Sequence, residues 1–294
     1  MRARSPKPRR LPKAAPARAP RAPAGAWPIR SPHPQRRSKA SRRELTLHPI
    51  LFHFLGYPVK TYGVFVSLAH LAGILGVLFF VRRRGYPLER FVDLIFVVLL
   101  SGLTGGRLGY WLGHPGEIQS VGDFFALDRG GLSFFGGLSL AFPAYLFFLY
   151  RQRLPVWEIS DLLSPVLPLS LAILRLGCFG AGCCYGTATE LPWAVHPLGS
   201  AIGLHPSQLY ESGFLFLLSG GLVWLNARAR FKAGLVASFC MGAYGLYRLL
   251  FDSLRGDMEH GWPGGLSSSQ VLGLALFGLA LATAAFIKRA KRRG

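Results

Sequence analysis

The residues best suited to chemistry lie between positions 174 and 211. Arg175 falls inside an apolar run of membrane length, and a turn rich in glycine and cysteine follows it. An arginine inside a membrane span costs roughly 2.5 kcal/mol or more on insertion scales, so it needs a carboxylate partner or an anionic ligand. Arg175 is therefore the first candidate for a functional residue.

Two further arginines, Arg107 and Arg248, also lie inside apolar runs. Guanidinium groups bind phosphate through paired hydrogen bonds, so three of them together would suit a phosphate headgroup. The alternative is that the arginines pair with carboxylates of the protein itself. Arg248 and Asp252 are four residues apart and would share a helix face, and Arg107 could pair with another span. The sequence leaves both readings open.

Three cysteines, Cys178, Cys183 and Cys184, follow Arg175 closely, and Cys240 stands alone in a later apolar run. Four cysteines are too few for a disulfide scaffold. On an outer membrane face the trio could form a structural disulfide or stay as small buried thiols, which is the reading we favour. Redox chemistry, acceptance of lipid, or zinc binding with a fourth ligand such as His205 are the alternatives. We expect Cys240 to be inert packing.

The composition predicts a polytopic membrane protein. Of 294 residues, 51% are hydrophobic and only 16% are charged, which is too apolar for an ordinary soluble domain. The formal charge of +21 would suggest a nucleic-acid partner if it covered one face. However, 14 of the 34 Lys and Arg residues lie in residues 1–45, and most others cluster at the ends of apolar runs. The charge therefore indicates topology, and we predict no nucleic-acid partner.

Residues 1–45 are predicted to be a disordered tail. They are rich in Arg, Pro and Ala, and they hold too few large apolar groups for a core. They also lack the apolar centre of a signal peptide. The tail could be an arm that binds lipid headgroups or nucleic acid, or the product of a start codon assigned too early. The membrane domain is expected to cover residues 46–290.

Seven apolar runs of about 20 residues are each long enough to cross roughly 30 Å of hydrocarbon. They lie at residues 61–81, 91–112, 132–150, 159–178, 206–225, 235–254 and 266–287. The predicted fold class is therefore all-α, with a polar arm at 113–130 and a small head at 179–205 outside the membrane. Gly102, Gly105 and Gly106 in the second run predict close helix packing, since packing holds helices together in lipid.

The basic residues outside the tail give an orientation. Fourteen of them fall on one side of the seven spans, whereas Lys60, Arg129 and Arg255 alone fall on the other. Because Lys and Arg in short loops concentrate on the cytoplasmic side, this asymmetry predicts an outer N-terminus and a cytoplasmic C-terminus. The basic tail would then lie on the outer side, which weakens the case that it is translated and exported.

Seven short motifs occur in order along residues 46–290. They are Tyr62-Gly63, the run from Gly105 to Tyr110, the run from Gly130 to Gly137, Arg175-Leu176-Gly177 with Tyr185-Gly186, the run from Leu191 to Val195, the run from His205 to Glu211, and the run from Tyr244 to Arg248 with Asp252 and Arg255. In these motifs the chain resembles the prolipoprotein diacylglyceryl transferase family. Each motif alone is weak, but seven in order on seven predicted spans are specific.

The resemblance implies an enzyme of the bacterial cytoplasmic (inner) membrane that performs the first step of lipoprotein maturation. Its substrates would be phosphatidylglycerol and the lipobox cysteine in the signal peptide of a prolipoprotein, both reached within the lipid bilayer. The thiolate attacks the glyceryl carbon bonded to phosphate oxygen, so the enzyme must neutralise the departing phosphate and help to remove the thiol proton. This chemistry needs no metal or other cofactor.

The resemblance also implies roles for particular residues. Arg175 and Arg248 would hold the phosphate, and Tyr62 and Tyr244 would donate hydrogen bonds to lipid oxygens. Asp252, which stands where the family has glutamate, would orient Arg248. The remaining positions expected to bind substrate are Arg107, Gly136, Gly186, His205 and Arg255, the two glycines because they allow backbone to approach the lipid closely.

Three positions depart from the family pattern. Phe135 replaces the histidine usually proposed as the general base, Cys178 replaces an asparagine, and Cys183 replaces an acidic residue. Among the histidines expected on the outer side (His114, His196 and His205), each could substitute for the lost base, although an ordinary loop histidine is the reading we favour.

Two other functions stay open. A divergent paralogue on the same scaffold would handle another thiol or lipid. A small anion transporter would use the intramembrane arginines for its solute. Such a transporter should show inverted repeats, and the second half of the chain does not echo the first.

Overall fold

A computed structural model of the chain describes residues 49–114, 121–125, 131–196, 202–228, 231–256 and 265–290. The predicted tail at 1–45 lies outside the described residues, as do parts of the predicted arm and head. The elements, in order, are β1 Ile50–Phe54, β2 Tyr57–Lys60, α1 Thr61–Arg83, α2 Leu88–Gly113, α3 Val121–Phe125, α4 Phe134–Arg151, α5 Val156–Leu163, α6 Val166–Ala181, α7 Ser207–Arg228, α8 Leu235–Phe251, a 3-10 turn Asp252–Leu254, and α9 Ser268–Ala290.

Helices occupy all seven predicted places, and five are long and apolar enough to cross a membrane. These are α1, α2, α4, the pair α5–α6 taken together, and α9. α8 is shorter, with 17 residues. The protein is thus a mostly helical membrane protein. The predicted fourth span consists of two helices, because α5 ends at Leu163 and α6 begins at Val166. Pro165 lies directly before α6, and proline is favoured at the start of a helix.

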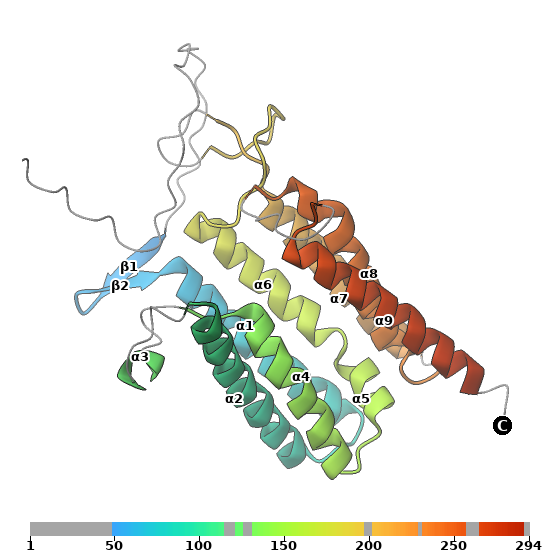
Figure 1. Cartoon of the computed structure of the whole chain (residues 1–294). Coiled ribbons are helices and arrows are strands. Elements are labelled where there is room, and N and C mark those ends of the chain that lie inside the picture. Colours follow the sequence, from blue (N-terminus) through green and yellow to red (C-terminus); the bar gives the residue numbers. More distant parts are fainter. Residues whose placement is uncertain are drawn as a thin grey trace, which may run out of the picture. The chain divides into compact units, whose positions relative to one another are not determined.

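A small β-hairpin that the sequence analysis did not predict precedes α1. Its antiparallel strands β1 and β2 are joined at Leu55 and Gly56, both with positive φ (49° and 83°), as two-residue hairpin turns require. The hairpin leads directly into α1 (Figure 1). It adds one two-stranded sheet to the fold predicted as all-α.

Helix α6 lies between two groups of helices. It packs on α1 on one side and on α7 on the other, while α2 pairs with α4 and α8 pairs with α9 (Figure 1). The α2–α4 pair is close enough that a Cβ added to Gly136 would lie 2.7 Å from the α-carbon of Gly109. Gly105, one of the glycines predicted to pack closely, also lies against the backbone of Gly136, so the close packing predicted for it is confirmed.

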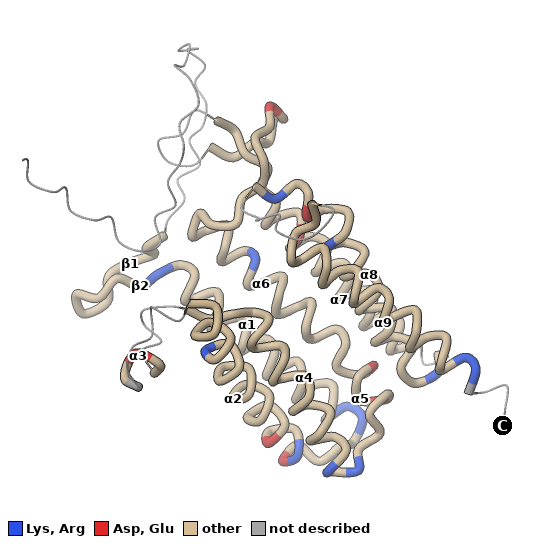
Figure 2. The backbone as a smooth tube through the Cα atoms, in the orientation of Figure 1, with Lys and Arg blue, Asp and Glu red and all other residues tan. Residues whose placement is uncertain are grey.

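The basic residues gather at one end of the helices. Figure 2 shows Lys and Arg where α1, α4 and α9 finish, and the last turns of these helices carry Arg82, Arg83, Arg151, Lys288 and Arg289. The main apolar core lies near the same end and includes the fully buried Val81, Phe91, Leu149 and Ile159. Arg175 and Arg248, two of the candidate functional residues, lie near the C-terminal ends of α6 and α8, away from this basic end.

Candidate functional site

One glutamate joins two of the three arginines that the sequence singled out. Oε2 of Glu211, at the start of α7, lies 2.8 Å from Nε of Arg175 in α6. Oε1 of the same carboxylate accepts a hydrogen bond of 2.9 Å from Nη2 of Arg248 in α8. Three helices therefore converge on one buried carboxylate, which is only 4% exposed as a residue.

A tyrosine and an aspartate fix Arg248 from its other sides. The hydroxyl of Tyr244 accepts hydrogen bonds from Nε (2.9 Å) and Nη2 (2.7 Å) of Arg248, and it donates one of 3.3 Å to Glu211. Oδ1 of Asp252 lies 3.4 Å from Nη1 of Arg248. The other oxygen of Asp252 accepts hydrogen bonds of 2.5 Å from both Ser267 and Ser269. Asp252 is thus placed where it can orient Arg248.

These contacts are the carboxylate pairing that the sequence left open as an alternative. Two guanidinium groups, Arg175 and Arg248, face two carboxylates, Glu211 and Asp252, so their formal charges balance. Burying a charge is tolerated only when it is paired and hydrogen-bonded, and this arrangement meets that condition. A phosphate could enter only by taking over part of the role of Glu211.

The other expected phosphate ligand, Arg107, makes different contacts. Its guanidinium donates to the backbone carbonyls of Asp123, Phe124 and Gly131 at 2.6, 2.7 and 2.8 Å. These three bonds tie α2 to the short helix α3 and to the segment before α4. The structure does not bring Arg107 into the Arg175–Glu211–Arg248 cluster, and its contacts are those of a residue that positions the arm.

Tyr62 lies close to Arg175, whereas Phe135 offers no proton acceptor. Tyr62, in the first turn of α1, is 44% exposed and interacts electrostatically with Arg175 and with the three neighbouring cysteines. Phe135 is 47% exposed, and its ring meets that of Phe134 edge-on at 5.9 Å. The position of the family histidine is thus occupied by an apolar side chain.

The two glycines expected to face lipid instead contact protein. Gly136 packs against the backbone of Gly105 and Gly109, so its missing side chain serves the α2–α4 contact. A Cβ at Gly186 would lie 2.5 Å from the Cβ of His205 and 2.6 Å from the carbonyl oxygen of Leu254. Gly186 therefore holds the segment after α6 against the end of α8.

The remaining candidates lie in the head and at its border. His205 has Nδ1 3.4 Å from the hydroxyl of Tyr210, which also accepts a hydrogen bond of 2.7 Å from the indole of Trp193. Arg255 pairs with Gly186 through an isolated β-bridge. His114 stacks on Tyr110 at 4.4 Å. His196 lies at the edge of the described head and has at least one interaction partner.

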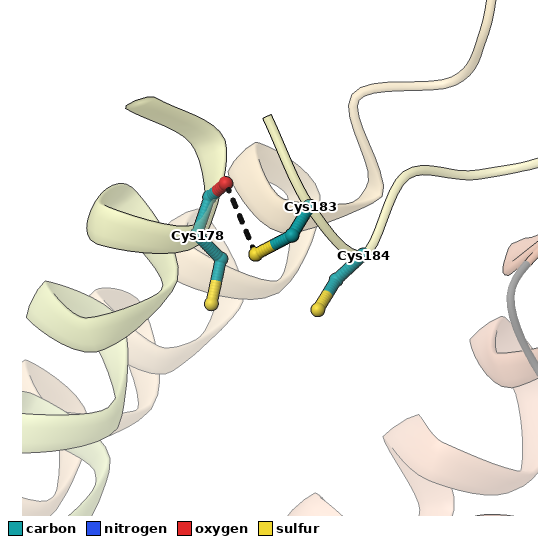
Figure 3. A group of neighbouring side chains, drawn as sticks. All are labelled: Cys178, Cys183 and Cys184. Atoms are coloured by element: carbon teal, nitrogen blue, oxygen red, sulfur yellow. Dashed lines mark hydrogen bonds between the residues drawn. The ribbon is translucent and has the colours of Figure 1, made fainter. Parts of the chain in front are cut away.

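The cysteines after Arg175 come together in space. The sulfur atoms of Cys178, Cys183 and Cys184 all lie within 4.8 Å of one another (Figure 3), and all three thiols are free. The pKa of the Cys183 thiol is raised, mainly by hydrogen bonding with Cys178 and Cys184 and to a smaller extent by burial. The thiol is therefore protonated near neutral pH. Arg175 interacts electrostatically with Cys178 and Cys184. The cluster therefore adjoins the arginine site.

An apolar cavity runs along α6 on the side of α1 and α2. Its volume is about 420 Å³, and it is lined by side chains that include His70, Leu99, Ser170, Leu171 and Leu174. Leu174 immediately precedes Arg175. A cavity of this lining suits hydrocarbon.

Sequence reasoning missed Glu211, Ser267 and Ser269. Glu211 was noted only as the last residue of a motif, although a carboxylate near the start of an apolar run is itself a signal that a cation must face it. Ser267 and Ser269 gave no such signal, because serines are common before a helix. Their role depends on the packing of α9 against α8, which no local pattern indicates.

Comparison with known proteins identifies the family of the chain. The family model described as prolipoprotein diacylglyceryl transferase matches residues 49–286. The chain is 32% identical over 240 residues to the phosphatidylglycerol–prolipoprotein diacylglyceryl transferase of Clostridium tetani, covering 78% of this chain and 93% of that protein. It is 35% identical over 228 residues to the protein of the same name from Bordetella parapertussis, covering 72% and 80%. The chain belongs to the prolipoprotein diacylglyceryl transferase family.

Proposed function

We propose that this protein transfers the diacylglyceryl group of phosphatidylglycerol to the lipobox cysteine of prolipoproteins, as the names of its relatives state for them. The observation that carries the proposal is the buried Arg175–Glu211–Arg248 cluster, whose Arg175 directly follows Leu174, a lining residue of the apolar cavity. The enzyme would lie in the bacterial cytoplasmic membrane with seven spans, an outer N-terminus and a cytoplasmic C-terminus. It would find both of its substrates in the bilayer.

The arginines would act on the leaving phosphate. In phosphatidylglycerol the phosphodiester carries one negative charge, and the glycerol phosphate that leaves after C–O cleavage carries a second. Guanidinium groups held in a water-poor site bind a phosphate with two negative charges more strongly than one with a single charge. They therefore stabilise the transition state, in which the second charge develops, more than the substrate. Phosphate oxygens would replace some contacts of Glu211, while Tyr244 and Asp252 keep Arg248 in place.

The other parts of the substrate have matching surroundings. The acyl chains would enter the apolar cavity, whose lining includes Leu174, one residue before Arg175. Tyr62, half-exposed beside Arg175, would donate a hydrogen bond to a lipid oxygen. His205 and Arg255 would border the site from the head. Arg107 would act indirectly, by holding the arm through backbone carbonyls.

The proposal is tested by measuring product formation. The purified full-length protein, phosphatidylglycerol vesicles and a peptide with a lipobox cysteine should yield a thioether-linked diacylglyceryl peptide, detected by its mass. Arg175→Ala and Arg248→Ala should each lower the rate at least about 100-fold, because each removes a preorganised donor to the developing charge. Arg90→Ala, which changes an exposed arginine in the first turn of α2, is the control. Wild-type rates in both variants would contradict the assignment.

Phe135 favours a second candidate, a divergent paralogue on the same scaffold that handles another thiol or lipid. A phenylalanine cannot take the proton from the acceptor thiol, so either another group does so or the reaction differs. Folded wild-type protein that forms no thioether product from phosphatidylglycerol would favour the paralogue.

A further inference from the structure

The three-cysteine cluster is built by the backbone in two stages. The first stage is the C-terminal cap of α6. The backbone N–H of Cys183 donates to the carbonyl of Cys178 at 3.1 Å, and that of Gly182 donates to Phe179 at 3.1 Å, with Gly182 at φ 71°. This bond pair is a Schellman motif, in which the side chains at the positions of Cys178 and Cys183 commonly meet. Local capping thus accounts for two of the three thiols.

The second stage adds Cys184 at a cost in backbone energy. Its φ of 62° lies in the left-handed region, which costs a residue with a Cβ about 1 kcal/mol or more. Two side chains from the start of α7 hold this conformation. Ser207 donates to the carbonyl of Cys184 at 3.0 Å, and Nε2 of Gln208 donates to the carbonyl of Cys183 at 2.6 Å. The strained turn brings the third sulfur to the first two.

Gln208 also leaves a polar atom open beside this turn. The residue is 3% exposed, and its carboxamide oxygen is buried without a hydrogen-bond partner among the described residues. Buried acceptors in folded proteins nearly always have a donor, so an unsatisfied one points to a group that the turn receives from outside. A metal-bound water or an incoming N–H group would satisfy it.

The sulfur geometry suits a thiophilic metal ion. Zinc–thiolate bonds of about 2.3 Å in tetrahedral or trigonal sites place their sulfurs roughly 3.8 to 4.0 Å apart. The three sulfurs lie within 4.8 Å of one another, so small rotations of the side chains would close the site (Figure 3). A disulfide would use only two of the three sulfurs, whereas one metal ion can bind all three.

We propose that Cys178, Cys183 and Cys184 bind a thiophilic divalent ion such as Zn²⁺, with a fourth coordination position that the acceptor thiol occupies. Three protein ligands with one open position are typical of reactive rather than structural zinc sites. The metal displaces the thiol protons of its ligands, that of Cys183 included. Arg175 offsets part of the negative charge of the three thiolates.

The role of the open position rests on the proposed function. The sulfur of the acceptor cysteine would bind the ion and release its proton to water, which is the task that Phe135 cannot perform. The bound thiolate would then attack the glyceryl carbon. The new C–S bond forms as the C–O bond to phosphate breaks, and glycerol phosphate leaves beside Arg175 and Arg248.

Metal binding is tested without reference to activity. The full-length protein, reduced and stripped of metal in detergent, is titrated with Cd²⁺, and the ultraviolet cadmium–thiolate absorption band is followed. One ion should bind per wild-type chain, and Cys178→Ser and Cys184→Ser should each weaken binding at least tenfold. Cys240→Ser is the matched control, because Cys240 lies in α8 and its thiol contacts the carbonyl of Ser164. Equal bands in all variants, or no band in the wild type, would overturn the site.

A second measurement uses only the wild-type protein and so does not depend on variants that fold. Stoichiometric Zn²⁺ should protect three of the four cysteines from alkylation, as counted by intact mass. Unprotected thiols would overturn the site, as would a chain that loses two hydrogens to a disulfide among these cysteines when zinc is present.

The open position has its own readout. With Co²⁺ in the site, N-acetylcysteine should shift the visible absorption bands toward those of four sulfur ligands. An unchanged spectrum would overturn the fourth-ligand role while leaving the three-thiolate site intact. Because neither readout involves lipid transfer, failure of the proposed function would remain distinguishable from failure of the metal site.

Discussion

Among single residues, Glu211 holds the central position in the candidate site. It contacts both Arg175 and Arg248, and it lies near the start of α7, where the preceding residues hold the cysteine turn. Removing one partner of a buried charge pair leaves an uncompensated charge, which costs about 3 to 5 kcal/mol. Glu211 therefore affects stability and substrate binding together.

The first prediction concerns Glu211→Gln, which keeps the size of the side chain and removes its charge. Arg175 would then lose its carboxylate partner and Arg248 would keep only Asp252, so the variant should unfold at a clearly lower temperature in detergent. Glycerol phosphate can replace the missing anion, so it should raise the melting temperature of this variant more than that of the wild type. Glu190→Gln, an exposed position in the head, is the control. Identical melting temperatures with and without the anion would argue against an anion site.

At the scale of elements, α2 and α4 approach through glycines, and this contact positions the arm that Arg107 binds. Helices in lipid gain little from apolar burial against each other, so close packing and interhelical bonds hold them together. A side chain in the α2–α4 contact must force the helices apart.

Gly136→Ala should therefore destabilise the protein by roughly 1 to 3 kcal/mol, the range typical of overpacking. The added Cβ would lie 2.7 Å from the α-carbon of Gly109, which is backbone and cannot move aside. Gly213→Ala in α7 is the matched control, since a Cβ there meets nothing within 4 Å. Thermal unfolding of both variants in the same detergent decides the point. Equal melting temperatures would refute the packing role.

The sequence predicted the places of the helices because apolar runs and basic ends depend on local composition. It missed the hairpin at residues 50–60, whose exposed strands lack a clear period-2 pattern. It also missed Asp161, which caps α8 by accepting hydrogen bonds from the backbone of Gly234 and Ala237 at 2.7 and 2.6 Å. Contacts of this kind join segments more than 70 residues apart, so no local spacing reveals them.

The same distinction applies to the site. The motif around Arg175 and the pair Arg248–Asp252 could be read from the sequence. The carboxylate of Glu211 that joins Arg175 to Arg248 could not. The three cysteines were read as a structural trio, but their convergence depends on Cys184 in a left-handed conformation, which is rare for a residue with a side chain. The two glycines assigned to lipid contact lie close to other parts of the protein, Gly136 to the backbone of α2 and Gly186 to His205 and Leu254.

At the scale of the whole molecule, charge separates the two ends of the membrane domain. Basic residues collect where α1, α4 and α9 finish (Figure 2), whereas the arginine–carboxylate cluster has balanced formal charge and includes Arg175 and Arg248 near the C-terminal ends of α6 and α8. Membrane insertion places such basic ends in the cytoplasm. The active site would then face the side where secreted prolipoproteins emerge.

Reporter fusions test this orientation. Green fluorescent protein fused after Gly294 should fluoresce, and alkaline phosphatase fused at the same point should be inactive, because it needs the oxidising outer compartment. A fusion at Gly113, at the end of α2, should show the opposite pair of signals. The reverse pattern at either point would exclude the proposed topology.

In the proposed function, Arg175 and Arg248 bind the phosphate of the lipid substrate. Equilibrium binding of phosphatidylglycerol and of diacylglycerol, which lacks the phosphate, to the purified protein in the same detergent measures this role. The wild type should prefer phosphatidylglycerol by at least tenfold, and Arg175→Ala and Arg248→Ala should each lose that preference while binding diacylglycerol as before. A preference that both variants retain in full would show that these arginines do not bind the phosphate.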